Sequence, residues 1–71
     1  MFKPNLFKAA LVARGISQKE LAAHLNLNGS TVYRKIQANG DFSREEINSI
    51  IEYLNLSPDE YEAIFFASEL A

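Results

Sequence analysis

The sequence has no cysteine and no tryptophan, and its 71 residues include only three glycines and two prolines. The absence of cysteine excludes disulfides and thiolate metal ligands, which is typical of proteins from a reducing cytoplasm. No apolar run approaches the roughly 20 residues that a membrane-spanning helix needs, and the first residues lack a signal-peptide pattern. Two separate cores would not fit in so short a chain. We therefore expect one soluble cytoplasmic domain over residues 1–71.

Basic and acidic residues are separated along the chain, although the formal net charge is only -2. The first 40 residues contain six basic residues and one acidic residue, which gives this part a net charge of +5. From Asp41 onward, one arginine stands against eight acids, a net charge of -7. The first part suits contact with phosphate groups, and the second suits solvent or a basic protein partner.

Apolar residues recur at spacings of three and four through most of the chain, and no sustained strand-like alternation occurs. The sequence therefore predicts an all-α fold of five helices, over residues 4–14, 18–25, 29–37, 44–54 and 58–68. Ser17, Ser43 and Ser57 each stand three residues before a glutamate, the pattern in which both side chains cap a helix start. The paired acids Glu45-Glu46 and Glu60-x-Glu62 are then expected in first helical turns, where they stabilise the helix dipole, rather than in catalytic carboxylate pairs.

Three residues that tolerate a left-handed backbone mark the expected helix ends. Gly15 ends the first helix, and Asn26 and Asn55 end the second and fourth within the related segments Leu-Asn-Leu-Asn and Leu-Asn-Leu-Ser. We expect a positive φ at both asparagines. Asn28 then caps the third helix.

One apolar cluster should form the core, because its members fall on the same side of their helices. The expected members are Phe7, Leu11, Ile16, Leu21, Leu25, Leu27, Val32, Ile36, Ile47, Ile50, Ile51, Leu54, Tyr61, Ile64 and Phe65. Phe2, Phe42 and Phe66 fall outside these stripes, and Phe66 with Leu70 predicts apolar surface at the carboxyl end. Such aromatics either mark an interface or wrap the edges of the domain.

The predicted helices 18–25 and 29–37, joined by a short turn, form a helix-turn-helix candidate. In this arrangement the second helix enters the major groove, so its outer face must carry small and hydrogen-bonding side chains. With Val32 and Ile36 pointing inward, that face and its leading tip present a DNA- or partner-binding surface. Its members are Asn28, Gly29, Ser30, Tyr33, Arg34 and Gln37.

The segments ISQKELAAHL (residues 16–25) and STVYRKI (residues 30–36) resemble the Cro/CI (XRE-type) helix-turn-helix family of phage repressors. The resemblance covers about residues 6–60 and implies a lambda-repressor-like five-helix DNA-binding domain. It implies that Gln18 holds a DNA phosphate, with Lys19 and Lys35 as flanking phosphate contacts. Base-reading positions of the family fall on Asn28, Gly29, Ser30 and Arg34.

Two functions follow from this resemblance. One is a Cro-like repressor that acts directly on operator DNA. The other is an antirepressor, which binds the DNA-binding domain of a partner CI-type repressor in the bacterial cytoplasm and has weak or conditional DNA contact of its own. The sequence is similar to small phage modulators of repression, and its acidic carboxyl half suits a basic protein partner. The sequence alone favours the antirepressor.

Enzymatic chemistry has no support in the residue pattern. His24 is the one histidine of the chain, so no partner completes a metal site, and we expect it to be exposed. No base accompanies the serines, and no glycine-rich phosphate loop occurs. We expect no catalytic activity, cofactor, metal ion, small-molecule substrate or membrane partner.

Overall fold

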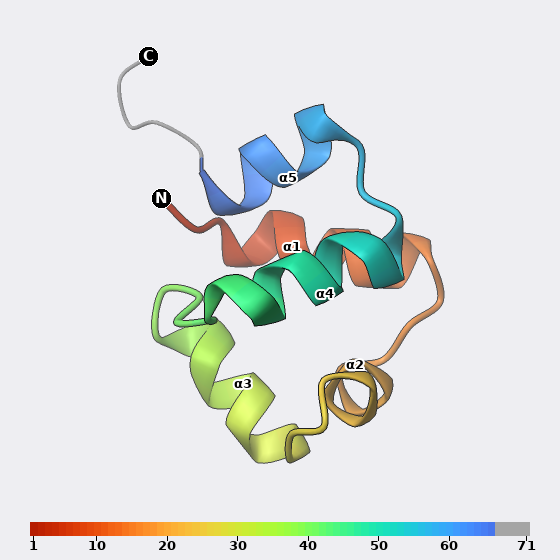
Figure 1. Cartoon of the computed structure of the whole chain (residues 1–71), viewed down its shortest axis with the longest axis vertical. Helices are drawn as coiled ribbons and strands as arrows, with labels where there is room; N and C mark the ends of the chain where they lie inside the picture. Colours follow the sequence, from red (N-terminus) through yellow and green to blue (C-terminus); the bar gives the residue numbers. More distant parts are fainter. Residues whose placement is uncertain (67–71) are drawn as a thin grey trace.

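A computed structural model describes residues 1–66, which form five helices and no strand (Figure 1). The helices are α1 (Pro4–Ala13), α2 (Gln18–His24), α3 (Gly29–Gln37), α4 (Arg44–Leu54) and α5 (Pro58–Phe65). The all-α prediction is confirmed, and all five helices begin where the sequence predicts. α1 and α2 end one residue early, whereas α5 ends at Phe65 and its predicted end, Ser68, lies outside the described residues.

The α2–α3 pair forms one end of the molecule, and α5 forms the other. Figure 1 shows α1 and α4 between them, with α2 and α3 at the bottom of the view and α5 at the top. Within residues 1–66, no helix could span a lipid bilayer.

Helices α2, α4 and α5 begin with complete capping boxes. In α2, the Glu20 backbone N–H donates to Ser17 Oγ at 3.0 Å, and the Ser17 backbone N–H donates to Glu20 Oε1 at 2.9 Å. The same reciprocal bonds join Ser43 to Glu46 and Ser57 to Glu60. Each box satisfies two backbone donors that a helix start otherwise leaves without a partner, so the three serines act as caps.

Three helices end in the same type of left-handed turn. Gly15, Asn26 and Asn55 have φ values of 66°, 59° and 54°, as the sequence predicts. After each of them, the next amide donates to the carbonyl five residues earlier, with N···O distances of 3.0, 2.8 and 3.0 Å. This 6→1 bond is the mark of the Schellman motif, and it brings an apolar residue back toward the helix that has just ended.

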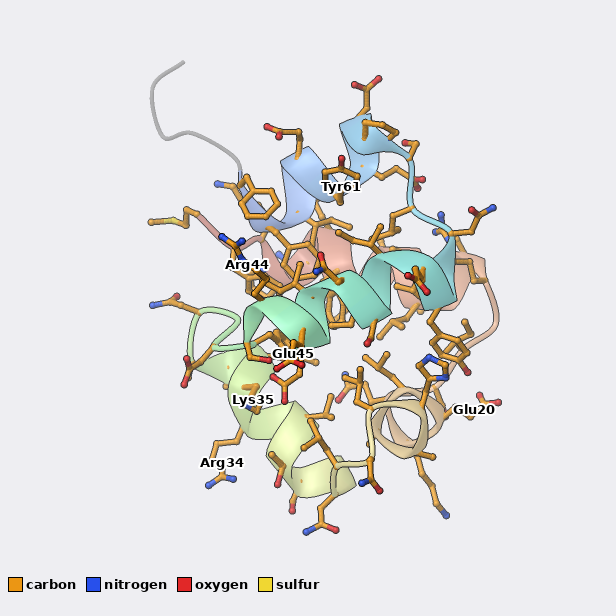
Figure 2. All side chains as sticks on the ribbon, in the orientation of Figure 1. Glu20, Arg34, Lys35, Arg44, Glu45 and Tyr61 are labelled. Atoms are coloured by element: carbon orange, nitrogen blue, oxygen red, sulfur yellow. The ribbon has the colours of Figure 1, made fainter. Side chains whose placement is uncertain are left out.

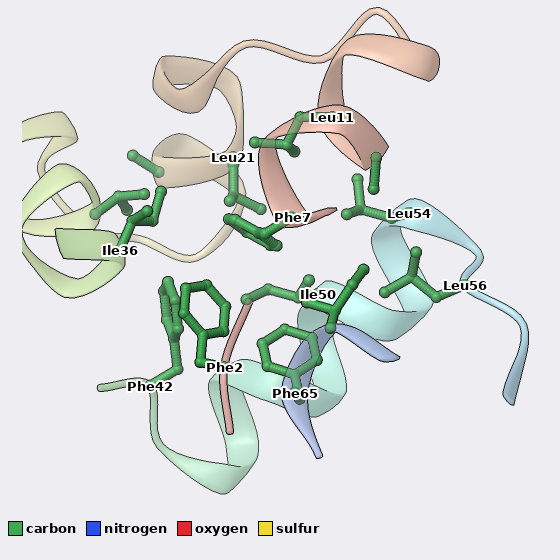
Figure 3. Packing of buried hydrophobic residues seen from close by; sticks show 14 residues of the cluster. Phe2, Phe7, Leu11, Leu21, Ile36, Phe42, Ile50, Leu54, Leu56 and Phe65 are labelled. Atoms are coloured by element: carbon green, nitrogen blue, oxygen red, sulfur yellow. The ribbon is translucent and has the colours of Figure 1, made fainter. Parts of the chain in front are cut away.

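The core is continuous, and Phe7, Leu21 and Ile50 lie fully buried in it (Figure 3). The stripes predicted on the five helices are confirmed, although some of their members are only partly buried. These are Ile16, Leu25, Leu27, Ile47, Ile51 and Tyr61. Ala10, Ala22 and Leu56 join the buried cluster.

Phe2 and Phe42 are buried in the core, so of the two alternatives that the sequence leaves open for them, the interface is wrong. They are only 7% and 8% exposed, and the Phe2 ring lies 5.6 Å from Phe7 and 5.7 Å from Phe65, centroid to centroid. Phe42 packs on the same Phe7 ring at 5.9 Å. Both lie outside the helices, where a helical periodicity cannot place them.

Gly40 allows Phe2 to reach this position. Its φ of 68° is left-handed, and a Cβ atom on it would overlap the Phe2 ring. The Lys3 backbone N–H donates to the Ile64 carbonyl at 2.8 Å, which holds the amino-terminal segment against α5. A residue other than glycine at position 40 would therefore displace the aromatic cluster.

Arg14, the residue that follows α1, joins three helices. Its Nη2 donates to both carboxylate oxygens of Glu60 on α5, at 3.0 and 3.1 Å. Its Nε donates to the Leu54 carbonyl at the end of α4, and its Nη1 donates to the Ala10 carbonyl of α1 at 3.1 Å. Because the guanidinium carries several donors in a fixed plane, one side chain satisfies partners on three elements.

The Ser57 backbone N–H and the Arg14 guanidinium both donate to Glu60 and hold the pKa of its carboxyl below the usual value of 4.5. A lowered folded-state pKa contributes stability that is present above the unfolded value and is lost as the pH falls through the folded pKa. We expect Glu60→Gln to lower the Tm at neutral pH, with the difference from wild type shrinking below about pH 4.5. Thermal unfolding followed by circular dichroism over a range of pH measures this difference in Tm. The exposed Glu62→Gln is the control, and a Glu60→Gln deficit that stays constant under acid would contradict the assignment.

Candidate nucleic-acid interface

Two buried residues fix the orientation of α3. Val32 and Ile36 are 0% and 1% exposed, and they share the core with Leu21 and Ala22 of α2. Because these anchors stand four residues apart, they hold one side of the helix inward and turn the other side to solvent. α2 and α3 thus form the predicted helix-turn-helix, joined by residues 25–28.

The outer face of α3 is exposed as the sequence predicts. Ser30, Tyr33, Arg34 and Gln37 are all exposed, and Tyr33 is 57% accessible. Figure 2 shows Arg34 projecting away from the other helices. Its Nη2 lies 3.5 Å from Thr31 Oγ1, at the outer limit of a hydrogen bond, so the rest of the guanidinium is available to a ligand. Contact between this face and DNA stays a prediction.

The leading tip of α3 differs from the starts of the other capped helices. Asn28 occupies the N-cap position, but its side chain makes no capping hydrogen bond, so the prediction that it caps through its side chain is wrong. Its amide group remains exposed. The next residue, Gly29, has ordinary helical geometry, and a Cβ atom there would meet nothing within 4 Å. The fold itself therefore does not require glycine at position 29. Because glycine has no side chain, a macromolecule could approach the backbone closely at this end of α3.

Two of the predicted phosphate contacts lie at the start of α2. Gln18 is the first residue of that helix and is half-buried, and Lys19 is exposed. Among the described residues no ion pair engages Lys19. A phosphate group could therefore bind its ammonium without breaking an internal contact.

Lys35, the third predicted phosphate contact, is engaged inside the domain. Its Nζ donates to the Asp41 carbonyl at 2.9 Å, lies 3.6 Å from Glu46 Oε1 and stands 6.0 Å from the centre of the Phe42 ring. These contacts join the end of α3 to the start of α4. The sequence does not predict this role, because the contact of Lys35 with Glu46 depends on how α3 and α4 pack against one another. Lys35 as a phosphate contact stays a prediction, and DNA would compete there with Glu46.

His24 is exposed, as predicted, and its ring stacks on Tyr53 of α4 with centroids 4.0 Å apart and planes 9° apart. Residues 1–66 hold no group of three His, Cys, Asp or Glu side chains placed to bind a metal ion. The chemistry that this surface offers is therefore hydrogen bonding and charge, supplied by amide, hydroxyl, phenol and guanidinium groups.

A comparison with protein families decides what kind of helix-turn-helix this is. The model of the Cro/C1-type HTH DNA-binding domain matches residues 7–61, from Phe7 of α1 into α5. The chain belongs to the Cro/C1-type helix-turn-helix family. This Cro/C1-type match spans most of the chain and covers both helices of the motif. No match was found among curated proteins or among solved structures.

A helix-turn-helix presents its second helix to DNA. The second helix of the motif here is α3, which Val32 and Ile36 hold with its outer face exposed. The matched family is a DNA-binding one, as a transcription regulator requires.

The internal contacts of Lys35 generate a stability prediction. Lys35→Met keeps the apolar stem against Phe42 but removes the ammonium that bonds Asp41 and Glu46. Because these contacts are partly solvent-exposed, we expect a loss of about 1 kcal/mol in the free energy of unfolding, measured by urea denaturation. Lys19→Met is the matched control and should change stability by less than about 0.5 kcal/mol. Equal stability of both variants would show that Lys35 does not brace the α3–α4 turn.

Proposed function

We propose that this chain is a transcription regulator that binds operator DNA directly and reads it with α3. The observation that carries the proposal is the outward face of α3, on which Arg34 and its hydrogen-bonding neighbours are exposed while Val32 and Ile36 lock the helix from behind. The family match adds support, because it covers this motif with a DNA-binding domain model.

In this proposal α3 lies in the major groove, which is wide enough to admit a helix. The Arg34 guanidinium donates two hydrogen bonds to O6 and N7 of a guanine, the pairing that its fork geometry suits best. The free amide of Asn28 is able to pair in the same way with an adenine at the leading tip. Ser30 and Gln37 add single hydrogen bonds, and Gly29 lets the tip approach the bases closely.

Contacts to the DNA backbone position the domain without reading sequence. Gln18 at the start of α2 and the exposed Lys19 supply them on one side of the motif. The net charge of +5 over the first 40 residues supports binding to a phosphate backbone, whereas the acidic remainder would be turned away from it.

A second candidate is the antirepressor of a phage genetic switch, which docks on the DNA-binding domain of a CI-type repressor. Two observations favour it: the net charge of -7 after Gly40, and Tyr33, which is 57% exposed beside Arg34. Amphipathic aromatics are enriched at protein interfaces, and an acidic surface complements a basic DNA-binding domain. We favour direct DNA binding over the antirepressor, because direct binding uses the whole outer face of α3 and needs no second protein.

Selection from a random DNA pool, followed by titration of the selected duplex in fluorescence anisotropy, tests the first candidate. We expect specific binding with a steep salt dependence. Arg34→Ala should weaken it by about 1 to 3 kcal/mol, because a bidentate base contact is lost. Lys8→Ala, which removes the same charge from α1, is the control and should change affinity far less. Failure to select any sequence, or equal effects of the two variants, would contradict direct readout by α3.

A competition experiment on a DNA duplex distinguishes the second candidate from the first. The chain is added to a complex of a CI-type repressor with its operator. Loss of the repressor complex, with no binding of the chain to the operator alone, identifies an antirepressor. Independent binding of the chain to DNA identifies direct action.

A further inference from the structure

Of the phenylalanine and tyrosine side chains in residues 1–66, two are exposed to solvent. Phe66 is 52% exposed, as the prediction of apolar surface at the carboxyl end requires; Leu70 lies outside the described residues. Tyr33 is 57% exposed and lies on the outer face of α3 beside Arg34. The base contacts proposed above for α3 give the Tyr33 ring no partner.

A small open space lies beside Gly29, on the same side of α3 as Tyr33. The two residues stand four apart, so they are neighbours one helical turn from each other. Side chains of a helix lean toward its amino terminus, which directs the Tyr33 ring toward the turn that contains Gly29. The ring does not fill that turn, because a Cβ atom built on Gly29 would have no heavy atom within 4 Å. A space large enough for a methyl group is therefore open beside Gly29, and the Tyr33 ring borders it.

We propose that this space, the Gly29–Tyr33 notch, receives the C5-methyl group of a thymine when α3 lies in the major groove. The inference rests on the proposed binding of α3 to DNA and adds a pair of specificity-determining residues to it. The thymine methyl is the apolar group that the base pairs present in the major groove, where the other edge groups donate or accept hydrogen bonds. The Tyr33 ring gives this methyl group an apolar contact, and the missing side chain at position 29 lets the base edge approach.

The notch gives a function to two features that the fold does not require. Glycine stabilises a helix less than alanine does, and nothing around position 29 excludes a larger residue. Tyr33 leaves most of an apolar ring in contact with water. Cytosine presents an amino group at its edge but no methyl group, so the notch favours thymine over cytosine at the base pair that it faces.

Replacement of thymine by deoxyuridine tests this inference, because it removes the C5-methyl group and keeps the hydrogen-bonding groups of the base. Each thymine of the selected duplex is replaced in turn, and binding is measured by fluorescence anisotropy. We expect at least one replacement to weaken binding of the wild-type chain by about fourfold, the effect of one buried methyl group. The same replacement should have no further effect on Gly29→Ala, whose own methyl group fills the notch, or on Tyr33→Ala, which lacks the ring.

Two controls separate loss of the notch from loss of the fold. Gly29→Ala should unfold at a Tm no lower than that of the wild type, because the added Cβ atom meets nothing and alanine favours a helix. Tyr33→Phe keeps the ring and should keep the fourfold preference for thymine.

Wild-type binding that no replacement weakens would overturn the inference and leave direct binding by α3 intact. A preference for thymine that survives in either Gly29→Ala or Tyr33→Ala would do the same. A chain that selects no duplex at all would instead contradict the proposed function, and this inference with it.

Discussion

Burial of Val32 and Ile36 is the constraint on which the surface of this protein depends. These side chains fix the rotation of α3 about its axis, since turning the helix would expose them and bury Arg34 or Tyr33 without partners. The core that receives them is built from all five helices and from the amino-terminal Phe2, so α3 is held by the whole domain. A rigid base of this kind presents hydrogen-bonding side chains in a fixed array, which reading base edges requires.

Local rules made most of the fold predictable. Capping boxes and left-handed asparagines act within a few residues, so the helix starts and the turns at Asn26 and Asn55 could be assigned from short segments. The burial of Phe2 and Phe42 could not be predicted, because both residues lie outside the helices and their burial depends on how the whole chain packs. Arg14 and Glu60 are 46 residues apart, and a contact of that range leaves no periodic signal in one sequence.

The candidate site, like the fold, could be predicted from the sequence only in part. The outer face of α3 followed from helical geometry and from two apolar anchors. The family resemblance implies that Lys35 contacts a DNA phosphate, yet Asp41 of the following loop and Glu46 of α4 engage it within the domain. The charge asymmetry of the chain is also spatial: the basic residues of the first part lie on or beside α1, α2 and α3, and most acids of the described residues lie on α4 and α5. The α2–α3 end of the molecule thus carries the surface that we propose binds DNA.

The central claim is that α3, and not the α4–α5 side, meets the target macromolecule. Titration of the isotope-labelled chain with its selected duplex, followed by amide chemical shifts, tests this claim residue by residue. The account predicts that the largest shifts fall on residues 28–37 and on Lys19, with Tyr33 and Arg34 among the most affected. Shifts confined to α4 and α5, with α3 unchanged, would contradict it.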